Sequence, residues 1–182
     1  SSVPDSLSAQ LDPDNKLLQH MPIRRMDAES IRDHILASSG TLKNELYGRG
    51  VLPYVNDQPN SRAKPPTGPL DGEGRRSIYI QVRRNFLPSF LRAFDFPPST
   101  EPVGQRPITT VPAQSLALLN HPLVHEQSRK WAERILKSEG SVEDRIKLLH
   151  RQAFAREARA DEILWAFGAL GTFDVSVDQA AA

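Results

Sequence analysis

Arginines gather in the middle of this chain at a spacing that could bind an anion. The cluster consists of Arg75, Arg76, Arg83, Arg84 and Arg92. No acidic residue stands among them, and the first that follows is Asp95. A guanidinium group binds sulfate, phosphate and carboxylate through paired hydrogen bonds. The cluster therefore predicts an anion-binding site, with an acidic polysaccharide as the candidate ligand.

The same arginines have a structural interpretation. The chain holds 22 acidic residues, and ion pairs within a protein outnumber ligand sites. If residues 77–82 form a strand, Arg76 and Arg84 lie on the same face as the alternating aliphatic side chains. A buried charge without a partner is costly. On this interpretation Arg76 and Arg84 pair with carboxylates or carbonyl groups of the chain, or with another part of the protein.

Other chemistries find less support. His121 and His125 are four residues apart beside Glu126, but the sequence offers no third metal ligand, so both are expected to be solvated. Asp95 and Glu101 could act as paired carboxylates only if the fold brings them together. The chain contains no cysteine, which excludes thiol catalysis, thiolate zinc sites and haem attachment through cysteine. Neither a G-x-S-x-G elbow nor a nucleotide-binding glycine motif is present. We assign no catalytic residue, no metal site and no cofactor.

Net charge and the length of the apolar runs argue against two further features, a nucleic-acid partner and a membrane span. The formal net charge is +1, so no global field attracts nucleic acid. No apolar run approaches the ~20 residues that span a bilayer. We therefore expect neither a nucleic-acid partner nor a membrane span.

Helical spacing of apolar residues dominates the rest of the chain. It predicts helices at about 27–39, 113–119, 122–138, 142–154 and 161–170. Asp27 is a candidate N-cap, Gly40 a helix stop, and Ser141 with Asp144 resembles a capping box. Trp131 and Trp165 stand among aliphatic residues at helical spacing, which favours core packing over ligand stacking.

The elements around the arginine cluster are less regular. Residues 77–82 fit a short strand or a buried helix, and the pattern alone does not decide between them. Phe86, Phe90, Leu91 and Phe94 share one helical stripe and are predicted core residues.

Two Pro-rich stretches interrupt the helical pattern. They are residues 48–74, with five glycines and five prolines, and residues 95–112, with five prolines. We expect both to be irregular loop insertions in a single helical domain at 27–170. An irregular extension at 1–26 should precede this domain, and a frayed tail at 171–182 should follow it.

Four longer segments carry a family resemblance. They are residues 14–18, 24–33, 75–85 and 109–120, and shorter matches occur at 93–95 and 145–146. Their order and spacing resemble the planctomycete family of proteins of unknown function numbered fifteen fifty-three, found in secreted proteins with cytochrome-c-like modules. This family usually has a Pro-rich turn near Arg156, but this chain has Glu157-Ala158-Arg159-Ala160, so its last two helices could merge.

The resemblance implies a context for the chain. The family's domain begins upstream of Ser1, so the chain would be its C-terminal part and would contact the upstream domains. The parent proteins are expected in the periplasm or outside the cell, with haem-binding modules elsewhere in the polypeptide. No catalytic residue can be carried over from the family.

These observations give one fold prediction and two functional hypotheses. The fold is mainly α, with about five helices around one core, long Pro/Gly-rich loops and, if 77–82 is extended, one short strand. The first hypothesis is a non-catalytic structural or interaction module of a larger multidomain protein. The second is acidic-polysaccharide binding, or part of a carbohydrate-active site that upstream residues complete.

Overall fold

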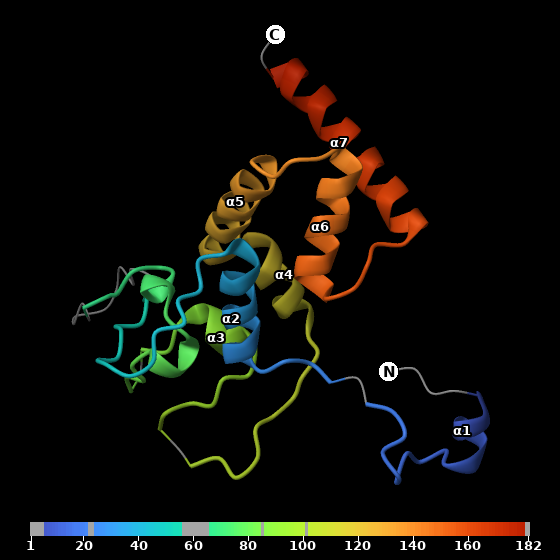
Figure 1. Cartoon of the computed structure of the whole chain (residues 1–182). Helices are drawn as coiled ribbons and strands as arrows, with labels where there is room; N and C mark the ends of the chain where they lie inside the picture. The colour runs from blue at the N-terminus through green and yellow to red at the C-terminus, as the bar shows by residue number, and fades with distance from the viewer. Residues whose placement is uncertain (1–5, 22–23, 56–65, 85, 101, 181–182) are drawn as a thin grey trace.

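The computed structural model describes residues 6–21, 24–55, 66–84, 86–100 and 102–180 and is mainly helical, as the sequence predicts (Figure 1). Its α-helices are α1 Ser6–Leu11, α2 Ala28–Ser39, α3 Ser89–Ala93, α4 Pro112–Asn120, α5 Pro122–Leu136, α6 Val142–Phe154 and α7 Ala160–Ala180. Short 3-10 helices cover Gly72–Gly74 and Ser77–Tyr79. The described residues contain no sheet, only two isolated bridges.

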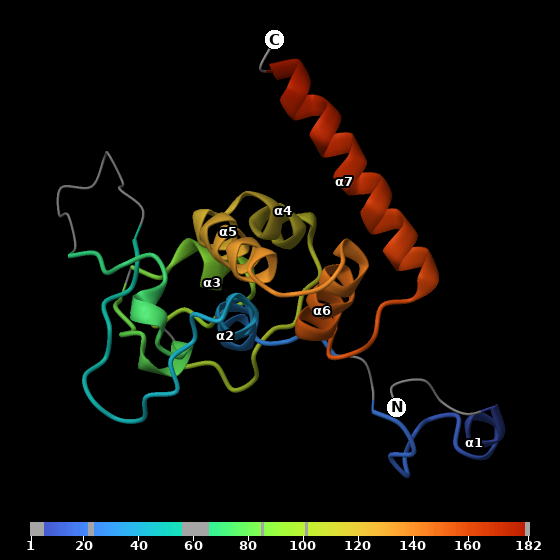
Figure 2. The same ribbon diagram turned by 45° about the horizontal axis from the view of Figure 1, so that its top comes forward.

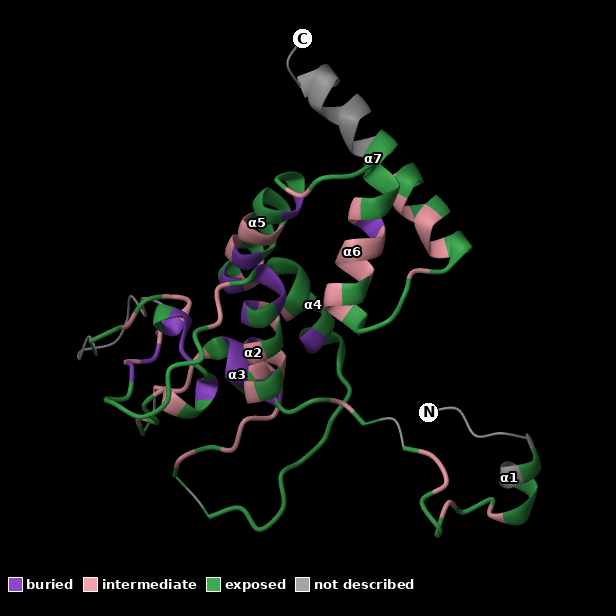
Figure 3. Ribbon diagram, in the orientation of Figure 1, coloured by how far each residue is buried: buried purple, intermediate pink, exposed green. Residues whose placement is uncertain are grey.

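The core lies where α2 packs against α3 and α5. Its buried residues are Ala28, Phe90, Leu91, Phe94 and Leu123. Figure 3 shows that burial is concentrated in these helices and in the loop segments beside them. The predicted aromatic stripe is therefore confirmed as core, except that Phe86 is only half-buried.

Local sequence signals explain several helix ends. Gly40 adopts the left-handed conformation after α2, with φ 80°, and its N–H bonds to the Ala37 carbonyl. Asp27 is the N-cap of α2, although its side chain makes no capping hydrogen bond. Ser141 and Asp144 form a complete capping box at the start of α6.

Residues 77–82 form neither a regular strand nor an α-helix. A 3-10 turn leads into a single parallel bridge between Ile80 and Val51. The ladder cannot extend far, because the partner segment carries Pro53, which has no N–H to donate. Ile78 and Val82 are exposed, at 78% and 58%, rather than buried.

The C-terminal helices differ from the expectation in length. α6 and α7 do not merge, because Ala155 is left-handed, with φ 53°, and ends α6. α7 continues to Ala180, where the sequence predicts a frayed tail from 171 onward. No proline follows Gly171, and one glycine costs a helix only about 1 kcal/mol. Residues 181–182 lie outside the described part.

Two helices stand away from the core. Figure 2 shows α7 projecting past α6, and α1 apart from the other helices. α1 lies in the segment predicted to be irregular. Trp165 on α7 is 80% exposed, which corrects its prediction as a core residue. α7 contacts α6 at its first turn, where Glu162 lies 3.9 Å from His150, and Trp165 is left in solvent.

Candidate functional site

The predicted arginine cluster divides into residues with different surroundings. Arg75 is buried, and its guanidinium donates to the carbonyls of Glu45, Tyr47 and Arg49. It also lies 3.9 Å from the centre of the Tyr79 ring. These bonds fix the irregular segment 45–49 against residues 75–79, so Arg75 has a structural role.

Arg76 is paired but exposed. Its Nε lies 3.6 Å from Oδ2 of Asp33, and its side chain is 54% exposed. The other oxygen of Asp33 accepts hydrogen bonds of 2.7 Å from both the N–H and the hydroxyl of Ser77. A partner for Arg76 is therefore present as predicted, but the side chain is not in the interior.

The remaining arginines do not gather at one place. Within the described residues, Arg83, Arg84 and Arg92 have no hydrogen bond or ion pair from their side chains. Arg83 is half-buried and lines a pocket between α2 and residues 76–96, which we call the main pocket. Arg92 lines a second hollow with Pro98 and Ser99. The carboxylate or carbonyl partner predicted for Arg84 is not found in this part of the chain.

Arg32 is the buried charge that the sequence analysis missed. Its guanidinium donates to the carbonyls of Asp71 (2.6 Å) and Arg75 (3.0 Å) and to the Ser77 hydroxyl (3.0 Å). Burial lowers the pKa of Arg32, while Asp33 and Asp71 raise it. The available signal was its position, because Arg32 lies midway between buried Ala28 and Leu36 on one helical stripe.

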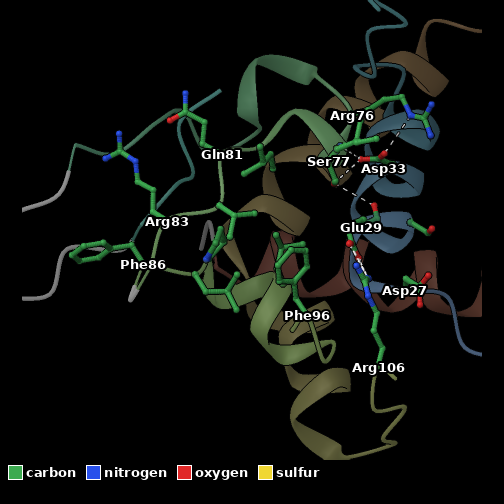
Figure 4. Close-up of a pocket in the computed structure, with 17 residues that line it drawn as sticks. Asp27, Glu29, Asp33, Arg76, Ser77, Gln81, Arg83, Phe86, Phe96 and Arg106 are labelled. Carbon is green, nitrogen blue, oxygen red and sulfur yellow. Dashed lines mark hydrogen bonds and ion pairs between the residues drawn. The ribbon is translucent and has the colours of Figure 1, made fainter. Parts of the chain in front are cut away.

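The main pocket has a volume of about 490 Å³ and lies between α2 and residues 76–96 (Figure 4). About half of its lining side chains are aliphatic or aromatic, among them Ile78, Val82, Phe86, Leu91 and Phe96, and the rest are polar or charged. This size is typical of ligand-binding clefts.

Ion pairs neutralise most of the charge in this pocket. Arg106 donates to both carboxylate oxygens of Glu29, at 2.8 and 2.9 Å, and its guanidinium lies 5.6 Å from the centre of the Phe96 ring. Arg76 and Asp33 form the second pair. Asp27 and Arg83 remain without a side-chain partner among the described residues, and Figure 4 shows them on opposite sides of the pocket. In the sequence, Arg106 lies in the Pro-rich loop at 95–112, after the end of the predicted cluster, and no sequence signal identified it.

His121 is a capping residue. It is the N-cap of α5, where its Nδ1 accepts the Leu123 N–H at 3.2 Å, and its Nε2 lies 3.2 Å from the Ser89 hydroxyl. Burial lowers its pKa. Across the described ranges, no three His, Cys, Asp or Glu side chains come together as metal ligands.

Asp95 also has a structural environment. It accepts hydrogen bonds from the N–H and hydroxyl of Thr109. It also forms an ion pair with Arg25, whose guanidinium nitrogen lies 2.5 Å from the Asp95 carboxylate. These bonds, with the Thr109 N–H contributing most, lower its pKa. Thr109 thus holds the loop end and does not cap α4, which begins at Pro112 with Val111 as N-cap. Glu101, the other predicted carboxylate, lies outside the described residues.

Comparison with known proteins gives one result. The model of the family described as "Protein of unknown function (DUF1553)" matches residues 1–167. No curated protein and no solved structure gives a significant match. Among the described helices, none is both long and apolar enough to cross a membrane.

Proposed function

The chain belongs to the DUF1553 family of proteins of unknown function, and from this premise we propose that it is a non-catalytic interaction module. Its partner would be another domain of the same parent protein, in the periplasm or outside the cell. The observation that carries this proposal is the exposure of helix α4, which is apolar along most of its length yet almost uncovered.

α4 has the composition of a buried helix. Its sequence is PAQSLALLN, and Gln114 is its only buried residue. Leu116 and Leu119 share one face at a spacing of three residues, and they are 57% and 67% exposed. Apolar surface in water costs about 25 cal/mol per Å² relative to burial, so such a helix gains stability when a partner covers it.

α7 carries a second exposed apolar surface. Leu164 and Trp165 on its first turns are 74% and 80% exposed. Apolar patches of this kind mark interfaces more often than isolated exposed leucines do. No charged residue lies in α4, so the surface favours an apolar polypeptide face over a sulfated or phosphorylated ligand.

Site-specific photo-cross-linking in the full-length protein tests this proposal. p-Benzoylphenylalanine at Leu119 should form a cross-link to another domain of the same polypeptide, which mass spectrometry of the digest would locate. The same label at exposed Glu139 serves as the matched control. Equal labelling at both positions, or none at Leu119, would contradict docking through α4.

Acidic-polysaccharide binding, alone or as part of a carbohydrate-active site completed by upstream residues, is the second candidate. It is favoured by Arg83, Arg84 and Arg92, which have no side-chain partners within the described part of the chain. Heparin-affinity chromatography of the Arg84→Ala and Arg92→Ala variants tests it. Retention that falls in both variants supports this function, and a wild-type chain that does not bind heparin excludes it.

A further inference from the structure

The segment that forms one wall of the main pocket has a free backbone edge. Val51 binds one edge of this segment, donating to the Tyr79 carbonyl and accepting from the Gln81 N–H, both at 2.8 Å. The Gln81 side chain closes the same edge by donating to the Gly50 carbonyl at 2.9 Å. Because successive residues of extended backbone point their polar groups to opposite sides, the Ile80 carbonyl and the Val82 N–H face the other edge, while the Ile80 N–H donates to the Ser77 carbonyl.

This second edge has open hydrogen-bonding positions. The Ile80 carbonyl and the Val82 N–H have no partner in the described parts of the chain. The two groups belong to residues two positions apart in the sequence. The same spacing separates the Tyr79 carbonyl and the Gln81 N–H, which both bind Val51. One residue of an added extended peptide could therefore bind both, as Val51 does on the other edge.

The pocket beside this edge suits apolar side chains. Ile78, Val82, Phe86 and Leu87 all line it, and Ile78 is 78% exposed. Alternate side chains of an extended peptide would lie against these residues. Backbone pairing would provide affinity and the apolar wall would provide selectivity.

Charge indicates what else the peptide should carry. Two of the three arginines that line the pocket are neutralised by Asp33 and Glu29, whereas Arg83 and the exposed Asp27 on the opposite side have no side-chain partner among the described residues. A half-buried guanidinium without a partner favours a carboxylate on the ligand.

We propose that the main pocket binds an extended, apolar peptide segment that carries an acidic residue. The segment adds to the free edge at Ile80–Val82 and pairs its carboxylate with Arg83. This site is separate from the apolar faces of α4 and α7, so the two proposals can fail independently.

Phage display tests the preference for an acidic residue. A library of random dodecapeptides is selected on the wild-type chain and, separately, on the Arg83→Glu variant. Wild type should enrich peptides that combine β-branched or aromatic residues with Asp or Glu, and Arg83→Glu should shift the selection toward Lys and Arg. Arg84→Glu is the matched control, because this neighbour is exposed and does not line the pocket. A wild-type selection without acidic residues, or an equal shift in the Arg84 variant, would overturn the proposal.

Fluorescence anisotropy with the selected peptide then tests the geometry. Ile78→Ser should weaken binding about tenfold, whereas Leu119→Ser on α4 should leave it unchanged. N-methylation of the single peptide residue that binds the edge should also cost about tenfold, while N-methylation of its neighbours should not. Binding that depends equally on Leu119, or that tolerates N-methylation at every position, would refute addition at the Ile80–Val82 edge.

Discussion

Two buried arginines hold the irregular half of this protein against its helices. Arg32 reaches from α2 to the backbone at Asp71 and Arg75, and Arg75 reaches on to the carbonyls of residues 45–49. One guanidinium group can donate hydrogen bonds to several backbone carbonyls at once. The ammonium group of a lysine could not bind the same carbonyls in this geometry. The charged side chains thus replace regular secondary structure in this region.

Truncating Arg32 should destabilise the protein strongly. Arg32→Ala leaves the Asp71 and Arg75 carbonyls without their donor in the interior, and we expect a loss of about 3–5 kcal/mol in the free energy of unfolding. Arg84→Ala, at an exposed position, should change it by less than ~0.5 kcal/mol. Urea denaturation followed by circular dichroism measures both values. Similar stability of the two variants would show that Arg32 is dispensable.

Gly74 should tolerate no side chain. Its φ is 73°, and a Cβ atom there would stand 2.4 Å from the Thr41 carbonyl oxygen. Gly74→Ala should therefore cost more than about 1 kcal/mol, since both the conformation and the close approach oppose it. A Cβ atom at Gly104 would meet no atom of the described residues within 4 Å, its chain neighbours aside, so Gly104→Ala should be neutral or slightly stabilising. Thermal melting of the pair checks the contrast, and equal melting temperatures would contradict it.

At the scale of elements, helix ends are decided by individual side chains. His121 caps α5 with a neutral ring nitrogen, and Glu162 holds the start of α7 beside α6. Glu162 accepts hydrogen bonds from Arg156 at 2.6 and 2.7 Å and from the Arg159 N–H at 2.9 Å. Both arrangements depend on protonation, so each predicts a pH dependence.

The cap of α5 should weaken in mild acid. Burial holds the pKa of His121 below its usual 6.5, so its contribution is complete above that pH and is lost as the pH falls below it. His121→Asn preserves a capping acceptor and should remove this part of the pH dependence, whereas His121→Ala should cost about 1 kcal/mol at neutral pH. Urea unfolding at about pH 7.5 and about pH 5 compares them. The same pH dependence in wild type and His121→Asn would exclude His121 as its source.

The start of α7 should respond at lower pH. Arg156, followed by the Arg159 N–H, lowers the pKa of Glu162 from 4.5 to about 2. Its stabilising contribution is therefore present above about 4.5 and lost as the pH falls toward 2. Glu162→Gln should melt earlier than wild type at neutral pH, and the difference should vanish near the lower limit. A difference that persists in strong acid would mean that Glu162 acts through packing.

At the scale of the whole molecule, burial is uneven. The α2–α3–α5 core is well covered, whereas α4 and the described part of α7 are mostly exposed (Figure 3). Such a distribution is expected of a module that completes its packing against another polypeptide.

Replacing exposed and buried leucines should separate surface from core. Leu116→Ser with Leu119→Ser should reduce fluorescence of the apolar dye ANS and change the free energy of unfolding by less than ~0.5 kcal/mol. Leu123→Ala, in the core, should instead cost about 2–5 kcal/mol. Strong destabilisation by the double serine variant would show that α4 is already covered by the chain itself.

The sequence by itself determined most of the helices. Helical spacing placed α2, α4, α5 and α6 within a few residues of their ends, because an apolar stripe and its caps are local properties. Gly40 and the Ser141–Asp144 box are local signals of the same kind, since each acts on backbone groups a few residues away. In the predicted aromatic stripe, Phe90, Leu91 and Phe94 likewise proved to be core residues.

Only the tertiary structure decided which charges are buried and which apolar residues are exposed. Arg75 and Arg76 are neighbours in sequence, yet one is buried among backbone carbonyls and the other is exposed beside Asp33. Trp131 and Trp165 follow similar patterns, but Trp131 is half-buried and donates to Gln152 of α6, whereas Trp165 is left in solvent. The pocket joins Glu29 to Arg106 across 77 residues of chain. Such contacts depend on how the helices and loops pack, and no periodicity within one segment records that packing.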